Sequence, residues 1–240
     1  MPEWLAAARA YGLLSRLPDR LVAEVIAQAQ RVEYPKGAIG LRWDDKPLTA
    51  ILLRGTARSF LSYPDGSQVT ARYLRTGDVV GVFAARLPRI SRGLQALEPC
   101  ELLMITADRM RELSMAHPEF AWALVEEMTT ILNLAQRALY LRAFGTVRQR
   151  VAVAIMDRAR LGGEVNAGLT VPGTQAELAT GAGTVREVVA TVLHGFKREG
   201  IVDVRRGGVV ILAPERLARE ADVGFDAPPP DRGQSAQRAV

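Results

Sequence analysis

Apolar residues recur at helical spacing between residues 174 and 198, and polar signals divide this segment into two helices. Thr174-Gln-Ala-Glu177 and Thr184-Val-Arg-Glu187 both have the form Thr-x-x-Glu, which is the pattern of a helix N-terminus closed by a capping box. The sequence Thr180-Gly-Ala-Gly183 lies between them and can supply the positive φ angle of a tight turn. The pattern therefore predicts a helix-turn-helix whose second helix begins at Thr184.

Two short apolar segments after these helices predict a β-hairpin. Residues 201–204 and 209–212 are rich in Val and Ile, and Arg205-Arg-Gly-Gly208 between them has the composition of a tight turn. A hairpin with arginines at its tip beside a helix-turn-helix forms a wing, and the second helix of such a unit can enter the major groove of DNA. Ordinary helix pairs carry the same capping pattern, so the hairpin is what favours the DNA-binding interpretation.

The N-terminal half of the chain changes from a helical pattern to a strand pattern. Residues 3–30 carry apolar positions at spacings of three and four and predict two short helices interrupted by Pro18. From Val32 onward, short apolar segments alternate with turn sequences such as Pro64-Asp-Gly66 and Thr76-Gly-Asp78. Strands at such short intervals predict an antiparallel barrel or sandwich.

One long helix is predicted over residues 118–144, with Pro118 in its first turn. Its apolar residues repeat at spacings of three and four, but they form a stripe too broad for a single neighbour. We expect one part of the stripe to face the barrel and the other part to form a homodimer interface; a core helix in a monomer is the alternative. The predicted interface residues are Val125, Met128, Leu132, Ala135 and Leu139.

The amino-acid composition limits the kinds of protein that this chain can be. The chain has 31 Lys and Arg against 26 Asp and Glu, and its isoelectric point of about 9.8 is compatible with a nucleic-acid partner. Its single cysteine, Cys100, excludes an intramolecular disulfide and is expected to be a buried structural thiol, and the 2 histidines offer no recognisable metal set. Because the sequence lacks a membrane-spanning apolar run, an export signal and a catalytic motif, we expect a cytoplasmic protein that is not an enzyme.

Basic residues are concentrated between residues 137 and 160, where six arginines accompany a single acid, Asp157. Most of these arginines are expected to be solvated on helix surfaces. Arg148 and Arg150 begin the predicted DNA-binding domain and are therefore candidates for contacts with DNA phosphates.

Several motifs together resemble the cyclic AMP receptor and fumarate-nitrate regulator (Crp/Fnr) family of bacterial transcription factors. The opening T-Q-x-E-L-A at Thr174, the G-x-x-R-E core at Gly183 and the closing E-G-I at Glu199 match the family's winged helix, and residues 48–81 and 97–105 follow its sensor domain. The resemblance implies an α+β fold with an N-terminal jelly-roll (cyclic-nucleotide-binding-like) β-barrel, a long dimerisation helix and a C-terminal winged helix-turn-helix. The expected parts are a sensor domain at 1–116, the helix at 117–145, a DNA-binding domain at 146–221 and a disordered tail at 222–240.

For function, the resemblance implies a transcription regulator that binds double-stranded DNA as a homodimer on an inverted repeat, with RNA polymerase as a candidate partner. Side chains at the start of the second helix would read bases, and others on the helices and the wing would hold phosphates. The expected base contacts are Arg186, Glu187 and Thr191, and the expected phosphate contacts are Thr174, Thr184, His194, Lys197, Arg205 and Arg206. A protein-interaction module without specific DNA binding is the alternative.

The sensor domain departs from its nucleotide-binding relatives at the candidate effector pocket. Val82 stands where those relatives carry a glutamate for the ribose, and Ile90 stands where they carry an arginine for the cyclic phosphate. Arg89 and Arg92 flank Ile90, and a gap of one or two residues would instead place one of them there. Loss of these charge-assisted bonds predicts that cyclic AMP is not bound tightly. An apolar small molecule and no effector at all are both open, and the sequence identifies no cofactor. The candidate pocket residues are Gly81, Val82, Arg89, Ser91 and Arg92.

Overall fold

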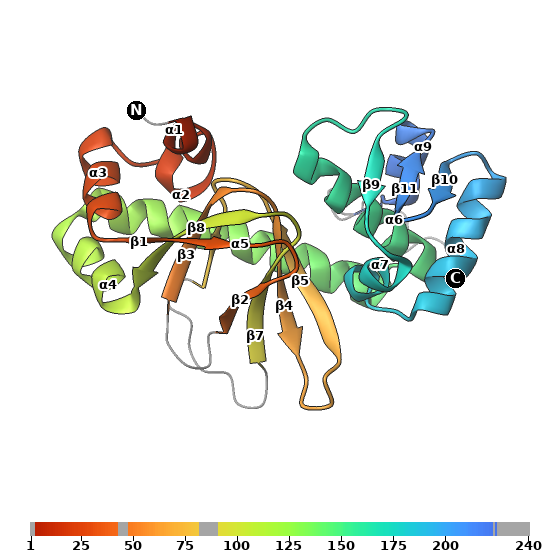
Figure 1. Cartoon of the computed structure of the whole chain (residues 1–240), viewed down its shortest axis with the longest axis horizontal. Coiled ribbons are helices and arrows are strands. Elements are labelled where there is room, and N and C mark those ends of the chain that lie inside the picture. Colours follow the sequence, from red (N-terminus) through yellow and green to blue (C-terminus); the bar gives the residue numbers. More distant parts are fainter. Residues whose placement is uncertain (1–2, 43–47, 82–90, 223, 225–240) are drawn as a thin grey trace, which may run out of the picture.

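A β-sandwich in the N-terminal half and a small helical domain in the C-terminal part are joined by one long helix (Figure 1). The computed structural model describes residues 3–42, 48–81, 91–222 and 224. Of the predicted tail at 222–240, only Asp222 and Gly224 fall within the described residues. In that part of the chain, no helix is long and apolar enough to cross a lipid bilayer.

Three short helices, not the predicted two, precede the sandwich: α1 (Glu3–Arg9), α2 (Gly12–Ser15) and α3 (Asp19–Ala27). Gly12 separates the first two because its φ of 68° departs from the helical path, and a Cβ there would lie 2.1 Å from the carbonyl oxygen of Gly77. Pro18 does not interrupt a helix. It is the extended N-cap of α3, where no helical hydrogen bond needs its missing N–H.

Two four-stranded antiparallel sheets form the sandwich. The first has the order β1 (Gln30–Tyr34), β8 (Cys100–Thr106), β3 (Leu48–Arg54) and β6 (Val79–Val80). The second has the order β2 (Ile39–Arg42), β7 (Ser91–Ala96), β4 (Ala57–Ser62) and β5 (Gln68–Leu74). The predicted antiparallel sandwich is confirmed.

Strand β3 is buried on both faces. Alternate side chains of β3 pack between the two sheets and against the helices. Leu52 points between the sheets, where it packs with Leu74 and Leu102. Ile51 and Leu53 point to the other face and pack in a cluster with side chains of the N-terminal helices. Each of these side chains is fully buried, which stabilises the fold by about 1.5–3 kcal/mol per side chain.

Cys100 begins β8 and is buried, as expected for a structural thiol. Its Sγ lies 3.0 Å from the carbonyl oxygen of Thr56 and 3.1 Å from that of Glu98. Burial raises the pKa of the Cys100 thiol, so the reactive thiolate form is disfavoured at this position.

Helix α5 (Pro118–Phe144) follows the shorter helix α4 (Ala107–Ala116), and its 27 residues confirm the prediction of one long helix. Its N-terminal half is fixed to the sensor domain by a buried charge. Glu127 is 2% exposed and accepts a hydrogen bond of 2.6 Å from Nη1 of Arg16. Because an unpaired buried carboxylate is costly, this pair holds α5 against the N-terminal helices.

The C-terminal domain runs through α6 (Val147–Ala159), a 3-10 turn (Arg160–Gly162), β9 (Thr170–Pro172), α7 (Gln175–Ala182), α8 (Arg186–Arg198), β10 (Val202–Arg205), β11 (Gly208–Ile211) and α9 (Pro214–Glu220). Its strands pair antiparallel in the order β10-β11-β9. Val189, Leu193 and Phe196 of α8 are buried in one cluster with Ile155 of α6 and Leu178 of α7. The predicted winged helix-turn-helix is confirmed.

Candidate nucleic-acid interface

The first helix of the helix-turn-helix begins at the predicted capping box. The hydroxyl of Thr174 accepts a hydrogen bond of 3.2 Å from the backbone N–H of Glu177, and the Glu177 carboxylate accepts one of 2.9 Å from the N–H of Thr174. Gly183 ends α7 with φ 60° and ψ 47°, a left-handed conformation that glycine adopts without a steric penalty. The capping box fixes where α7 begins, and Gly183 turns the chain toward α8.

The second helix begins later than predicted. Helix α8 starts at Arg186, and its N-cap is Val185, which has an extended conformation and makes no side-chain cap. Thr184 lies one residue before this N-cap, and its N–H donates to the carbonyl oxygen of Ala179 instead of to the Glu187 carboxylate, as a capping box would require. The capping box predicted at Thr184 is therefore wrong. As a result, Arg186 and Glu187 occupy the first turn of α8 and are both exposed.

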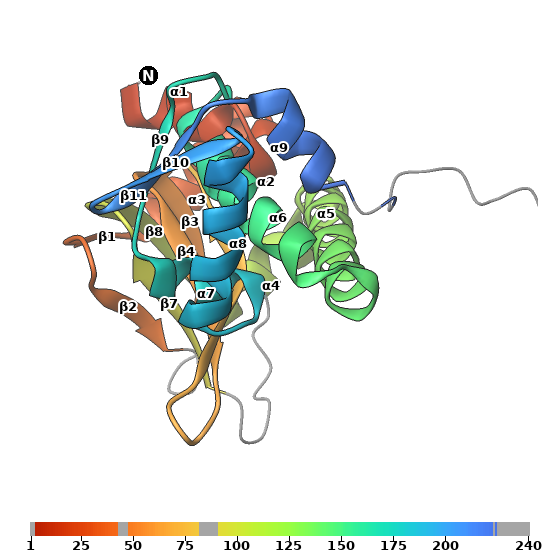
Figure 2. The same ribbon diagram turned by 90° about the vertical axis from the view of Figure 1, so that its right-hand side faces the viewer.

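Several predicted contact residues lie around one hollow on the outer side of this domain. Figure 2 shows α8 on that side, next to the hairpin of β10 and β11. The hollow has a volume of about 490 Å³ and is bordered by Thr174, Arg186 and Arg205. Thr191 and His194 lie further along α8 and are exposed. A helix N-terminus and two guanidinium groups around one hollow favour an anionic partner.

The carboxylate of Asp203 lies among the predicted phosphate contacts. Lys197 Nζ lies 2.9 Å from Asp203 Oδ1, and Arg205 Nε lies 3.3 Å from Oδ2. Hydrogen bonds from Lys197 and then Arg205 lower the pKa of the Asp203 carboxyl. Sequence reasoning missed this residue, although Asp203 and Arg205 are two apart on one strand and therefore share a face. Arg206, at the hairpin tip, is exposed.

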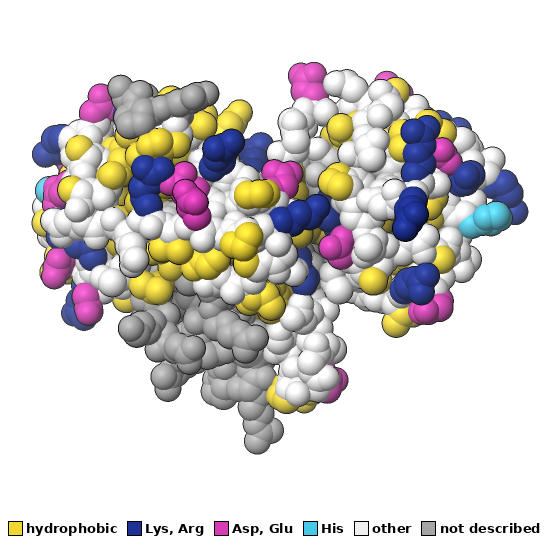
Figure 3. Space-filling model, in the orientation of Figure 1, with side chains coloured by type: hydrophobic (Ala, Val, Ile, Leu, Met, Phe, Trp, Pro, Cys, Tyr) yellow, Lys and Arg dark blue, Asp and Glu magenta, His cyan; other side chains and the backbone are white. Residues whose placement is uncertain are grey.

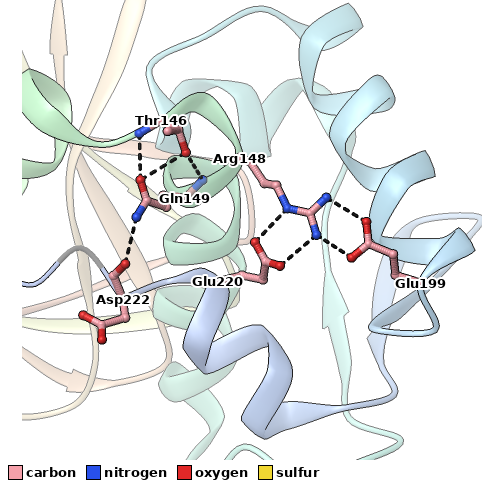
Figure 4. Close-up of polar contacts among 6 residues, drawn as sticks. All are labelled: Thr146, Arg148, Gln149, Glu199, Glu220 and Asp222. Atoms are coloured by element: carbon pink, nitrogen blue, oxygen red, sulfur yellow. Dashed lines mark hydrogen bonds and ion pairs between the residues drawn. The ribbon is translucent and has the colours of Figure 1, made fainter.

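Arg148 is part of an ion-pair network, not of a solvated surface (Figure 4). Its Nε donates to Glu220 at 2.7 Å, and its Nη1 and Nη2 donate to the two carboxylate oxygens of Glu199 at 2.9 Å and 2.6 Å. The guanidinium also lies 4.4 Å above the ring of Phe196. Arg148 therefore ties α6 to the end of α8 and to α9, and a DNA phosphate would have to compete with both carboxylates for it.

The Arg148 network should make the stability of this domain depend on pH. Hydrogen bonds from Arg148 lower the pKa of both Glu199 and Glu220. Since the folded-state pKa lies below the unfolded value of about 4.3, the stabilisation is present above that pH and is lost as the pH falls through the lowered values. We expect Arg148→Gln to lower the free energy of unfolding near neutral pH, and this difference to shrink below about pH 4.

Urea unfolding measured across this pH range tests the expectation. Arg219→Gln is the matched control, because it removes the same charge from an exposed position on α9. A difference between Arg148→Gln and wild type that stays constant as the pH falls would contradict the role given to these carboxylates.

Two other arginines that were expected on solvated surfaces make contacts between the domains. Arg158 is buried, lies 3.4 Å from the Glu177 carboxylate and has its guanidinium 5.8 Å from the ring centroid of Tyr73 on β5. Arg142 Nη2 donates to the carbonyl oxygen of Thr70 at 3.2 Å. The expectation of a solvated surface is wrong for Arg158, which is buried, whereas Arg142 is exposed and in addition bonds to β5.

The candidate effector pocket is only partly within the described residues. Val82 and Arg89 lie outside them. Gly81 has a φ of 78°, and Ser91 and Arg92 begin β7, where they pair with β4 and are half-buried. The pocket therefore stays a prediction.

The predicted dimer face of α5 is uncovered in the single chain. Val125, Leu132 and Leu139 are 52%, 57% and 69% exposed, Ala135 is exposed, and Met128 is half-buried. A shallow groove of about 420 Å³ runs along this face and is lined by five apolar side chains together with Ser114 and Thr129. A contiguous exposed apolar surface of this kind is characteristic of a protein–protein interface.

Comparison with known proteins matches both halves of the chain. A cyclic nucleotide-binding domain matches residues 31–117, and a Crp-like helix-turn-helix domain matches residues 149–220. The cyclic AMP receptor protein of Thermus thermophilus is 30% identical over 185 residues, which are 76% of this chain and 83% of that protein. The cAMP-activated global transcriptional regulator Vfr of Pseudomonas aeruginosa is 25% identical over 197 residues, which are 79% of this chain and 92% of that protein.

The fold of the chain is also similar to that of a solved protein structure. A solved structure of a Crp/Fnr-family protein from Eubacterium rectale has a TM-score of 0.71 at 21% identity, covering 88% of this chain and 98% of that one. This likeness shows that the chain shares the fold of that structure. Together with the two domain matches and the Thermus relative, this establishes that the chain belongs to the Crp/Fnr family of DNA-binding transcription regulators, which are not enzymes.

Proposed function

We propose that the chain regulates transcription as a homodimer that binds an inverted repeat in double-stranded DNA. The observation that carries this proposal is the exposure of Arg186 and Glu187 in the first turn of α8, beside the wing. A two-fold dimer presents two such helices to successive turns of the major groove, about 34 Å apart. RNA polymerase is a further candidate partner, to be tested separately.

The side chains of α8 suggest a half-site containing a G·C pair. Arg186 can donate two hydrogen bonds to O6 and N7 of a guanine, and Glu187 can accept one from N4 of a cytosine. The hydroxyl of Thr191 donates to the carbonyl oxygen of Glu187 at 3.1 Å, which leaves the Thr191 methyl for a thymine methyl. Val185, which is 59% exposed at the N-cap, adds a second apolar contact of the same kind.

The proposed phosphate contacts differ in how freely their side chains can reach a phosphate. Three of them are exposed: Thr174 at the start of α7, His194 on α8 and Arg206 at the tip of the wing. Lys197 and Arg205 share the carboxylate of Asp203. Since a phosphate must compete with that carboxylate for them, we expect these two to contribute less than Arg206 does. Thr184 is half-buried in the turn and is the weakest of the proposed contacts.

Replacing Arg206 by glutamine is expected to weaken binding to all DNA sequences alike. The variant loses one phosphate contact in each half-site, so the slope of log affinity against log salt should fall by about 0.9 per half-site. Fluorescence anisotropy titrations at several salt concentrations measure this slope. Arg111→Gln, which removes an exposed charge from α4, is the control and should leave it unchanged. An unchanged slope for Arg206→Gln would exclude the contact.

A protein-interaction module without specific DNA binding is the rival function. Filter binding of the purified protein to mixed DNA separates the two, because the rival predicts no specific complex even at low salt. The exposed recognition-helix start favours the DNA-binding function.

Cyclic AMP is expected to bind weakly or not at all, although the relatives from Thermus thermophilus and Pseudomonas aeruginosa are named for it. Val82 and Ile90, which lie outside the described residues, replace the charged groups for the ribose and the cyclic phosphate. Each lost charge-assisted bond removes about 1.5–3 kcal/mol of binding free energy. Isothermal titration calorimetry measures the affinity directly. A dissociation constant at or below about 1 μM, equivalent to 8.2 kcal/mol, would contradict this expectation.

A further inference from the structure

A cavity of about 450 Å³ lies where the sandwich, the long helix and the C-terminal domain meet. Strand β5 forms one wall, the second half of α5 another, and α6 with the start of the following turn a third. Figure 3 shows Lys and Arg side chains along the boundary between the two lobes. The cavity is lined by the arginines Arg72, Arg75, Arg137, Arg142, Arg150 and Arg160 and by the aspartates Asp78 and Asp157.

The two aspartates do not neutralise this arginine cavity. Asp78 accepts a hydrogen bond of 2.9 Å from the backbone N–H of Arg75, and Asp157 lies 4.0 Å from the guanidinium groups of both Arg137 and Arg160. Among the residues that the structure describes, Arg142 and Arg150 have no carboxylate within ion-pair distance. Six positive charges therefore face two negative ones, and the excess lies where α5 ends and α6 begins.

Arg142 and Arg150 are each incompletely satisfied. Nε of Arg150 is buried and has no hydrogen-bond partner among the described residues. Within the described part of the chain, Arg142 donates to a single carbonyl oxygen, that of Thr70. Burial lowers the pKa of the Arg142 guanidinium, and the nearby charge of Arg150 lowers it further. Two like charges beside a partly enclosed cavity are stabilised by an anion between them.

The rest of the lining of the arginine cavity is largely apolar and is called its apolar wall. It includes Leu134 and Leu141 of α5, Val153 of α6 and Leu161 of the following turn. A volume of this size is within the range of small-molecule sites, which combine apolar walls with a few polar groups that fix orientation. An inorganic ion would use only the arginines, whereas an organic anion would use both walls.

We propose that the arginine cavity binds a small organic phosphate, with its phosphate group held between Arg142 and Arg150 and its organic part against the apolar wall. A phosphate monoester offers two guanidinium groups three terminal oxygens and a charge of about −1.5 to −2, whereas a carboxylate offers two oxygens and a single charge. The bound phosphate links the end of α5 to α6 across the short connection at Gly145. The inference rests on the proposed DNA-binding function, in which this link would fix the orientation of the recognition helices.

Calorimetric titration of the full-length protein with phenyl phosphate tests the site, with inorganic phosphate as a second probe. We expect saturable binding of phenyl phosphate that is tighter than that of inorganic phosphate. Arg150→Gln should weaken it at least about tenfold, because a charge-assisted contact is lost. Arg150→Lys should retain part of the affinity, and Arg111→Gln, which removes an exposed charge far from the cavity, should retain all of it.

Two results would overturn the proposal: no saturable binding of phenyl phosphate to the wild-type protein, or equal binding by Arg150→Gln and Arg111→Gln. Circular dichroism establishes that each variant is folded. If Arg150→Gln does not fold, Arg142→Gln takes its place, and its binding of phenyl phosphate is compared with that of Arg111→Gln in the same way. The readout is direct ligand binding and needs no DNA, so the site is tested separately from DNA recognition.

Discussion

Replacing Arg186 by alanine is expected to weaken binding to the preferred inverted repeat by about 1–3 kcal/mol in each half-site. Arg186 is exposed in the first turn of α8, where its guanidinium can reach the edge of a guanine. The loss should be confined to one base position, so that the variant binds all four base pairs there with nearly equal affinity. Anisotropy titrations against a set of sites that differ at single positions measure the loss and its location.

The matched comparison is Arg206→Gln, in which the lost charge lies on the wing. That variant should lose affinity for every sequence equally, since a phosphate contact carries no sequence information. If Arg186→Ala behaves in the same way, with an equal loss for every sequence, then Arg186 holds a phosphate and the proposed base contact is wrong.

Replacing Leu132 by aspartate is expected to convert the dimer to a monomer. Leu132 is 57% exposed in the single chain and lies in the middle of the apolar face of α5. Two-fold symmetry would bury two unpaired carboxylates in one interface, and burial of an unpaired charge costs several kcal/mol. The dimer dissociation constant should therefore rise by at least about a hundredfold. Sedimentation equilibrium measures it.

Asn133→Asp is the control for this variant, because it adds the same charge at an exposed position beside the apolar face. It should leave the dimer intact. A wild-type protein that is monomeric at micromolar concentration, or a Leu132→Asp variant that remains dimeric, would contradict the proposed interface.

Local signals in the sequence predicted features whose partners are near neighbours. Thr174 and Glu177 form the predicted capping box because both groups lie within one helical turn. The same pattern at Thr184 predicted a helix start that the structure does not have, because the Thr184 N–H is already bonded to the carbonyl of Ala179. A four-residue pattern contains no information about that competing bond, which depends on how α7 ends.

Contacts between distant parts of the chain could not be predicted in this way. Arg148 pairs with Glu199 and Glu220, which are 51 and 72 residues away, so its role in joining α6 to α8 and α9 is visible only in the folded domain. Four of the six arginines between residues 137 and 160 line one cavity with two arginines of the β5 region. Residue type and periodicity indicated a basic cluster, but tertiary packing decides which guanidinium groups meet a carboxylate.

The candidate DNA interface was the more predictable site. Exposed residues at the start of a recognition helix follow from the helix-turn-helix pattern, and the structure places Thr174, Arg186 and Arg205 around one hollow. Asp203 pairs with Lys197 of α8 and Arg205 of β10, and this pairing was missed although Asp203 and Arg205 are two residues apart on one strand.

Selection of bound DNA from a random library by the purified protein, at about physiological salt, tests the proposed function most directly. We predict enrichment of an inverted repeat whose half-sites are about one helical turn apart, each with a fixed G·C pair that Arg186→Ala no longer selects. Recovery of no common sequence, or of single half-sites without two-fold symmetry, would contradict a dimer that reads DNA through α8.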